Sequence, residues 1–182
     1  MITPAKTAMR LATALAPAMM LAACASVPMT DSETIATASL LDTDGTPTGE
    51  ATLMGVGDTV ELSVTVAGLT PGEHGFHLHT TGRCTLPDFT SAGGHLNPSD
   101  EGHGLLDDDG SHLGDLPNLV AGPNGTARAQ VTIGTSRDYV LDNIFDADGT
   151  AIVIHADADD GRTDPSGNAG SRVRCGVLTP VT

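Results

Sequence analysis

The chain has 182 residues, of which 39% are hydrophobic and 2% are aromatic. That length fits a single domain with a buried core, and the scarcity of rings favours β-strands of Val, Ile, Leu, Ala and Thr over a cofactor pocket walled by aromatic side chains. The formal net charge of −15 at pH 7 makes nucleic acid and anionic lipid headgroups poor partners. We therefore expect a β-rich protein that binds no nucleic acid.

Residues 1–23 are predicted to form a signal peptide. Lys6 and Arg10 give it a positive start, and an apolar run over residues 11–23 ends in small residues. This run is shorter than the roughly 20 residues that a membrane-spanning helix needs. Its end, Leu21-Ala22-Ala23-Cys24, resembles the lipobox of bacterial lipoproteins, in which the cysteine is lipidated and becomes the mature N-terminus. The alternative is ordinary cleavage after the triplet at 23–25, which would give a soluble secreted protein.

Lipidation at Cys24 would place the protein in the periplasm or cell envelope, with membrane contact only through this N-terminal lipid anchor. Residues 24–32 would then be the lipidated cysteine and a short tether, and residues 33–182 the folded domain. Ala25 stands where an Asp signals inner-membrane retention in some bacteria. The outer membrane is therefore the favoured location.

The chain has three cysteines, and an odd number in an exported protein requires an explanation. With Cys24 assigned to lipid, Cys84 and Cys175 remain as one pair, which an oxidising compartment would keep bonded. Closing a loop of roughly 90 residues contributes on the order of 4 to 5 kcal/mol in chain-entropy models. The alternative is two unpaired buried thiols.

The domain reads as eight short strands separated by turns. In the third predicted strand, Val60, Leu62, Val64 and Val66 alternate with polar or small residues, which indicates antiparallel sheet with one buried face. Pairs such as Asp44-Gly45 supply the turn chemistry. The predicted strands are, in order, Glu33 to Leu41, Thr48 to Gly55, Asp58 to Gly68, His74 to His79, Asp115 to Ala121, Thr126 to Ile133, Gly149 to His155 and Ser171 to Thr179.

Two long segments lack any periodicity, one from Thr80 to Asp115 and one between His155 and Ser171. Loops of this length inside a compact domain are usually functional and tied down. The sequence shows neither a helix period nor an internal repeat. We therefore predict an all-β fold, an eight-stranded antiparallel Greek-key sandwich or flattened barrel with two long functional loops.

The seven histidines gather in and around these loops. Because successive side chains of a strand point to opposite faces, His77 and His79 point the same way and can share a metal ion. Together with His155 they form an imidazole set on strand ends, which suits a redox metal. His103, His112 and Asp115 add a carboxylate, which is typical of zinc. For one His-x-His pair alone, a strand with polar residues toward water is an equal alternative.

Four blocks of sequence, in order and at matching spacing, closely resemble copper/zinc superoxide dismutases across about residues 33–180. They are His74-Gly75-Phe76-His77-Leu78-His79, Gly94-His95-Leu96-Asn97-Pro98, His112-Leu113-Gly114-Asp115-Leu116, and Gly167-Asn168-Ala169-Gly170-Ser171-Arg172 continuing to Cys175-Gly176. That family has the sandwich architecture. The resemblance therefore implies the same fold that the strand pattern predicts.

The resemblance also implies two cofactors, copper and zinc, that share one ligand. Copper would be bound by His77, His79, His95 and His155, and zinc by His95, His103, His112 and Asp115. His95 would bridge the two metals. His74 would be structural and would bond to the backbone, rather than serve as a ligand.

Three further roles follow from the resemblance. Asp159 matches a carboxylate that links copper and zinc histidines, and such partners orient ligands; the alternative is a solvated acid. Arg172 matches the arginine beside copper, set there by a loop that is bonded through Cys84 and Cys175. A guanidinium remains charged and can bind a small anion such as superoxide, although a surface ion pair is an alternative. The resemblance gives Arg174 no role.

The implied activity is the dismutation of superoxide to dioxygen and hydrogen peroxide, in which copper is reduced and reoxidised and His95 leaves copper to take a proton. His95 and Arg172 would be the catalytic residues, and zinc would hold His95. The alternative function is an exported module that buffers copper and zinc without significant turnover. The pattern is compatible with either a monomer or a homodimer.

Overall fold

The computed structural model describes residues 32–108, 110–134 and 136–182. Its main sheet has eight antiparallel strands in the order β5-β8-β9-β1-β2-β3-β7, with β10 beside β1, and β4 pairs with β6 in a second sheet. The strands are β1 (Ser32–Asp42), β2 (Pro47–Val56), β3 (Thr59–Val66), β4 (Gly72–His74), β5 (Phe76–His79), β6 (Leu119–Ala121), β7 (Ala127–Ile133), β8 (Ala151–His155), β9 (Arg172–Val177) and β10 (Thr179–Pro180).

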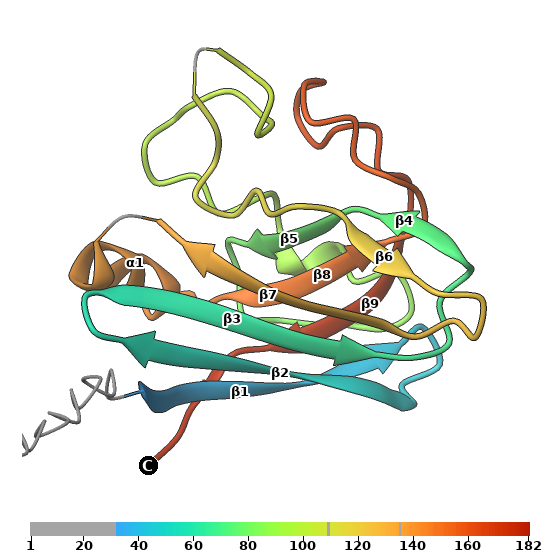
Figure 1. Ribbon diagram of the computed structural model, residues 1–182, viewed down its shortest axis with the longest axis horizontal. Helices are drawn as coiled ribbons and strands as arrows, with labels where there is room; N and C mark the ends of the chain where they lie inside the picture. The colour runs from blue at the N-terminus through green and yellow to red at the C-terminus, as the bar shows by residue number, and fades with distance from the viewer. Residues whose placement is uncertain (1–31, 109, 135) are drawn as a thin grey trace, which may run out of the picture.

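The main sheet curls into a half-barrel, and β6 lies against β7 at its edge (Figure 1). Strand β8 follows β7 in the chain but pairs with β5 and β9, a Greek-key crossover. The prediction of an all-β antiparallel fold is therefore confirmed. Among the described residues, no helix has both the length and the apolar character needed to cross a membrane.

The predicted alternation in β3 is confirmed, because Val60, Leu62, Val64 and Val66 are all at most 1% exposed. Together with apolar residues from β1, β2, β5 and β8, they form the barrel core. A second, smaller cluster lies outside the barrel under the first long loop and contains Phe89, Ala92, Ala151, Val153 and Cys175. The curled sheet thus has apolar packing on both faces near the disulfide.

The predicted strand from His74 to His79 is two strands, which meet at Gly75. Strand β4 pairs with β6, whereas β5 pairs with β8. At the break, the Gly75 N–H donates to the Asp157 carbonyl over 2.8 Å, and the His155 N–H donates to the Gly75 carbonyl over 2.8 Å. A Cβ atom at Gly75 would lie 2.6 Å from the Cβ of Ala169, so only glycine permits this approach.

Two other elements differ from the sequence prediction. Of the predicted strand from Asp115 to Ala121, only Leu119–Ala121 is strand, because Asp115 turns toward the histidines. A short helix, α1 (Arg137–Ile144), occupies the β7–β8 connection. It buries only Val140 and Ile144, one turn apart, which is too few apolar positions for a helical period to appear in the sequence.

The two long loops rise side by side above one end of the half-barrel (Figure 1). Among the described residues of the first loop, the single helical element is a one-turn 3-10 helix, η1 (Thr90–Ala92). The loops contact each other directly, because the Leu106 N–H donates to the Gly161 carbonyl over 3.0 Å. A Cβ atom at Gly104 would lie only 2.0 Å from that same carbonyl oxygen. The unpatterned segments are therefore ordered by contacts that are distant in the sequence.

The core position of Leu62 can be tested by truncation. Leu62 is fully buried in β3, so Leu62→Ala should lower the free energy of unfolding by about 2 to 5 kcal/mol through lost burial and a cavity. Leu105→Ala is the matched control, because Leu105 is 50% exposed and should change stability by about 0.5 kcal/mol or less. Urea unfolding measures both, and equal effects would contradict this core assignment.

Candidate metal centre

Six of the seven histidines and two carboxylates converge where the long loops meet β5 and β8. His77 and His79 belong to β5, and His155 ends β8. The first loop brings the rest to this edge through its backbone: the Leu78 N–H donates to the Gly114 carbonyl over 2.9 Å, and the Leu96 N–H donates to the Leu78 carbonyl over 2.8 Å. A Cβ atom at Gly114 would lie 2.3 Å from the Leu78 carbonyl oxygen, so this contact requires glycine.

The disulfide between Cys84 and Cys175 is confirmed, with a Cα–Cα distance of 5.7 Å and a sequence separation of 91 residues. It fixes the start of the first loop to β9. Phe89, which lies in the same loop, is fully buried beside Cys175. The loop is thereby held against the outside of the barrel next to the histidines.

The first group of potential ligands surrounds the Asp115 carboxylate. Asp115 Oδ1 lies 2.8 Å from His95 Nδ1 and 3.1 Å from the Nδ1 atoms of His103 and His112. His95 Nδ1 and His112 Nδ1 are 3.4 Å apart. Four atoms placed tetrahedrally about 2.0 Å from a zinc ion are about 3.3 Å from one another. The spacing of these four atoms therefore fits a four-coordinate zinc ion.

The other oxygen of Asp115 is held by the backbone. The Gly104 N–H donates to Oδ2 over 2.8 Å, and the His112 N–H donates to it over 3.1 Å. Burial disfavours the charged carboxylate, but the bond from His95 and the one from the Gly104 N–H outweigh it and lower the pKa of Asp115 to about 2. Asp115 is thus a carboxylate at neutral pH, the form that binds metal.

The second group consists of His77, His79, His95 and His155, all buried, with one ring nitrogen each within 4.8 Å of one another. Within the described part of the chain, these four nitrogens are buried and have no hydrogen-bond partner: His77 Nδ1, His79 Nε2, His95 Nε2 and His155 Nε2. Four unpaired imidazole nitrogens in one place would be costly unless they face a shared ligand. A copper ion suits this all-imidazole set.

The contacts of the other nitrogen in three of these rings explain why the first nitrogen has no hydrogen-bond partner. His79 Nδ1 lies 2.9 Å from the Gly93 carbonyl, His155 Nδ1 lies 3.2 Å from the Gly170 carbonyl, and His77 Nε2 lies 2.6 Å from Asp159 Oδ2. Each acceptor requires the proton on the nitrogen that faces it. The lone pair on the other nitrogen is therefore directed into the group, ready to bind a metal.

Burial keeps the imidazoles neutral, mainly because the charged form is poorly solvated there. It lowers the pKa of His79 to about 2, that of His155 to about 3 and that of His95 to about 4. Neighbouring histidines contribute in the same direction. Neutral imidazole is the form that can donate a lone pair to a metal.

Asp159, on the second loop, lies between the two groups. Its carboxylate is 2.6 Å from His77 Nε2 and 3.1 Å from His103 Nε2, and the Gly161 N–H donates to it over 2.6 Å. Burial opposes its ionisation, but these bonds together lower its pKa well below the usual value. A Cβ atom at Gly167 would lie only 1.8 Å from Asp159 Oδ1, so a glycine is needed here.

Arg172 lines a cleft of about 380 Å³ beside the second group, which His79, His95 and His155 also line. Its guanidinium donates to the Phe89 carbonyl over 2.7 Å and to the Gly93 carbonyl over 2.6 Å. The Gly93 carbonyl also faces His79, so one backbone oxygen positions both side chains. Gly93 has φ 77° and ψ −156°, a conformation that is essentially restricted to glycine.

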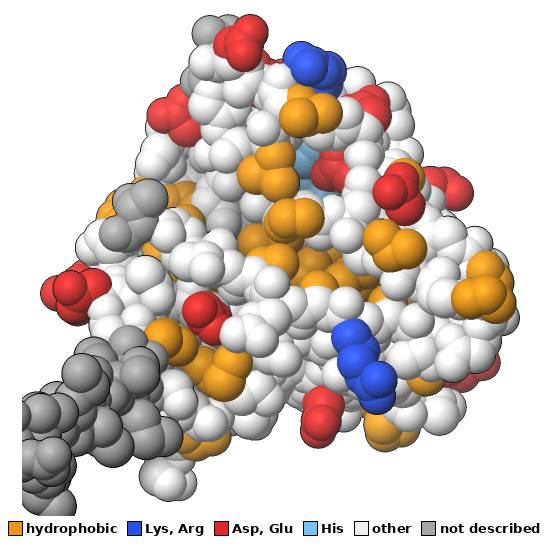
Figure 2. Space-filling model, viewed as in Figure 1, with side chains coloured by type: hydrophobic (Ala, Val, Ile, Leu, Met, Phe, Trp, Pro, Cys, Tyr) orange, Lys and Arg blue, Asp and Glu red, His pale blue; other side chains and the backbone are white. Residues whose placement is uncertain are grey.

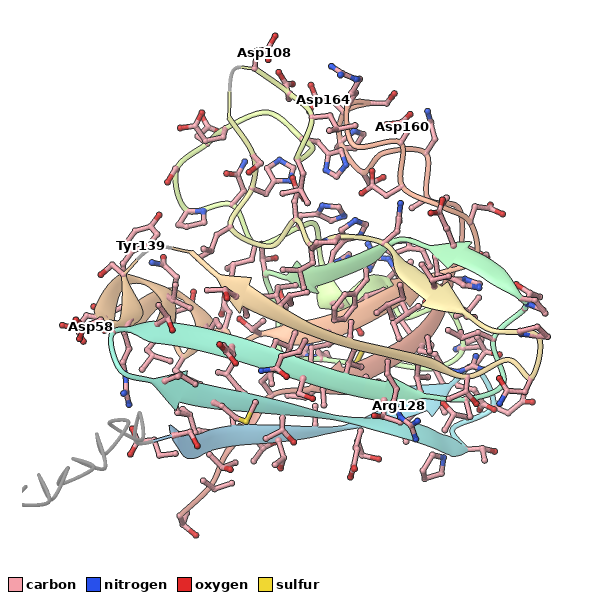
Figure 3. All side chains as sticks on the ribbon, in the orientation of Figure 1. Asp58, Asp108, Arg128, Tyr139, Asp160 and Asp164 are labelled. Carbon is pink, nitrogen blue, oxygen red and sulfur yellow. A yellow bond between two sulfur atoms is a disulfide. The ribbon has the colours of Figure 1, made fainter. Side chains whose placement is uncertain are left out.

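The structure thus brings together every metal-site residue that the sequence singled out, from segments up to 82 residues apart. Figure 3 shows side-chain rings between the loops and the sheet, and Figure 2 shows histidine at the bottom of the gap between the loops.

His74 lies outside both groups, and its ring nitrogens are 2.7 Å from the His155 carbonyl and 2.8 Å from the Thr70 carbonyl. Sequence reasoning missed Gly93, because its contribution is a backbone carbonyl. Cys24 lies outside the described residues.

Known proteins of one family resemble this chain over most of its length. The family model for copper/zinc superoxide dismutase (SODC) matches residues 47–178. The chain is 41% identical over 144 residues to superoxide dismutase [Cu-Zn] 2 of Aquifex aeolicus, covering 78% of this chain and 84% of that one. It is also 41% identical over 147 residues to superoxide dismutase [Cu-Zn] of Caulobacter vibrioides, covering 79% and 84%. The chain therefore belongs to the copper/zinc superoxide dismutase family.

Solved structures share the fold. The crystal structure of a SOD-like protein from Bacillus subtilis superposes with a TM-score of 0.72 at 36% identity, covering 79% of this chain and 97% of that one. Cu/Zn superoxide dismutase from Brucella abortus superposes with a TM-score of 0.64, covering 82% of this chain and all of that one. At 24% identity, the second likeness concerns the fold alone.

The link through Asp159 can be tested by an isosteric change. In Asp159→Asn, the side-chain amide cannot accept hydrogen bonds from both His77 and His103, so the affinity for each metal should fall by about 10- to 100-fold. Competition against a calibrated chelator measures this. Asp108→Asn is the matched control, because Asp108 is exposed near the tip of the first loop (Figure 3) and should bind metal as the unchanged protein does. Equal affinities for both variants would contradict the role of Asp159.

Proposed function

We propose that this protein catalyses the dismutation of superoxide to dioxygen and hydrogen peroxide. The observation that supports this most strongly is the group of four unpaired, buried imidazole nitrogens beside a cleft that also holds Arg172. The family to which the chain belongs is consistent with this activity. A protein that only stores metal would need neither an arginine in the cleft nor a histidine shared by the two groups.

The residues divide into two sets. His77, His79, His95 and His155 would hold copper, and His95, His103, His112 and Asp115 would hold zinc, with His95 common to both. Copper would supply the one-electron chemistry, oxidising one superoxide and reducing the next. The zinc set would fix His95 through its Nδ1 side, where Asp115 and His112 lie.

Arg172 would bind the anionic substrate. Its guanidinium is permanently protonated, and its two carbonyl partners hold it at the wall of the cleft, close to His79 and His155. Hydrogen peroxide formation consumes two protons for every two superoxide anions. His95 Nε2 is a suitable atom to hold one of them, because its ring lines the cleft and its Nδ1 is engaged on the zinc side.

Stopped-flow superoxide decay tests this activity directly. The metal-free and zinc-only proteins should leave the spontaneous decay unchanged, and the protein loaded with copper and zinc should accelerate it. Arg172→Gln in the fully loaded protein should lower the second-order rate constant by about 10- to 100-fold, the expected size for losing a charge-assisted hydrogen bond to substrate. Binding of both metals without accelerated decay would instead support the metal-buffering function.

We also propose that the protein is exported and anchored in the cell envelope by lipid on Cys24, with the outer membrane favoured. The positive start and apolar run before Leu21-Ala22-Ala23-Cys24 support this. The Cys84–Cys175 disulfide is consistent with an oxidising compartment, and the bacterial relatives are consistent with export.

Cell fractionation distinguishes lipidation from ordinary cleavage. When the full chain is produced in a bacterium that processes lipoproteins, it should remain with membranes in high salt and be released by detergent. Cys24→Ser should appear in the soluble periplasmic fraction or stay unprocessed. Recovery of the unchanged protein in the soluble fraction would contradict the anchor.

A further inference from the structure

Strand β9 contains a bulge next to Arg172. Strand β8 pairs with it in regular register up to Ile154 opposite Arg174, but the next residue of β8, His155, pairs with Arg172. Val173 is therefore an extra residue on β9. Such bulges change the direction in which neighbouring side chains point and are frequent beside active sites.

The extra residue places Arg172 on the cleft side of the sheet. Cys175 packs with Phe89 outside the barrel, whereas Val173 packs against the barrel core. In a regular strand, Arg172 is three residues from Cys175 and would face the opposite side, toward the barrel core. With the bulge, Arg172 shares a face with its partner His155 and reaches the carbonyls of Phe89 and Gly93.

Arg174 holds this bulge from the other side. Its guanidinium donates to the carbonyl of Val173, the bulged residue, over 2.7 Å. It also donates to the carbonyls of Gly68 over 2.6 Å and Ala67 over 3.3 Å, which directly follow β3. The side chain is 9% exposed. The planar guanidinium thus links the bulge to the residues that follow β3. A lysine ammonium group cannot reproduce this set of bonds.

We propose that Arg174 is a positioning residue that sets the placement of Arg172 through the Val173 bulge. This inference rests on the proposed function, in which Arg172 binds the substrate anion. Loss of the Arg174 guanidinium removes the donor from three backbone carbonyls and allows the bulge to shift. The Arg172 guanidinium then loses its fixed place in the cleft, although its own side chain is unchanged.

Azide binding to the copper- and zinc-loaded protein tests the proposal, because azide is a small anion whose binding to copper(II) is followed by charge-transfer absorption without turnover. The dissociation constant should rise by about 3- to 10-fold in Arg174→Met, which lies within the range of coupling seen between neighbouring residues. Arg174→Lys should also bind azide more weakly although it keeps the charge. Arg128→Met, which removes an exposed arginine of β7 far from the loops (Figure 3), should match the unchanged protein.

A double-mutant cycle separates positioning from stability and from simple charge loss. Once Arg172→Gln has weakened azide binding, adding Arg174→Met should change the dissociation constant no further, because Arg174 acts by positioning Arg172. If Arg174 acted only through its charge, its removal would still weaken azide binding in the Arg172→Gln protein. An unchanged dissociation constant in folded Arg174→Met, or an equal rise with and without Arg172, overturns the proposal. If Arg172→Gln alone leaves azide binding intact, the role of Arg172 in the proposed function fails as well. Thermal unfolding of each variant confirms that the folded protein is being titrated.

Discussion

The contacts of the Asp115 carboxylate hold the two groups of ligands together. One of its oxygens faces side chains, and the other accepts hydrogen bonds from the backbone. Its Oδ1 lies within 3.1 Å of the Nδ1 atoms of His95, His103 and His112. Its Oδ2 accepts backbone N–H groups from Gly104 and His112. Because His95 is held on this side, its Nε2 is left for the second group, so the geometry of one carboxylate determines where the two groups meet.

This arrangement buries unpaired polar atoms, which lowers the stability of the folded protein. The long loops hold the arrangement in place. The disulfide, the Gly114 carbonyl beside Leu78 and the contact between Gly104 and Gly161 each fix one part of a loop that has almost no regular structure of its own. The disulfide joins two side chains, and the other two contacts act on the backbone. They explain how neutral imidazoles stay close together with their lone pairs converging, which in water would be opposed by solvation and chain entropy.

The sequence predicted much of this and missed what depends on distant backbone contacts. Alternation identified β3, and the His-x-His spacing placed His77 and His79 on one face. Residue types alone grouped His103 and His112 with Asp115, whereas the place of His95 in both ligand sets came from the resemblance to a family. The break at Gly75 and the bulge at Val173 were not predicted, because their contacts, with Ala169 and through Arg174 with Gly68, join segments that are distant in the sequence. Helix α1 buries too little to leave a periodic signal.

We propose that His95 would be shared by two different metal ions, copper and zinc, each held by one of the two groups. Anomalous diffraction from crystals of the copper- and zinc-loaded protein, recorded at both absorption edges, tests it most directly. We expect one copper ion among His77, His79, His95 and His155, and one zinc ion among His95, His103, His112 and Asp115. Both metals in a single group, or a metal ion that does not contact His95, would contradict it.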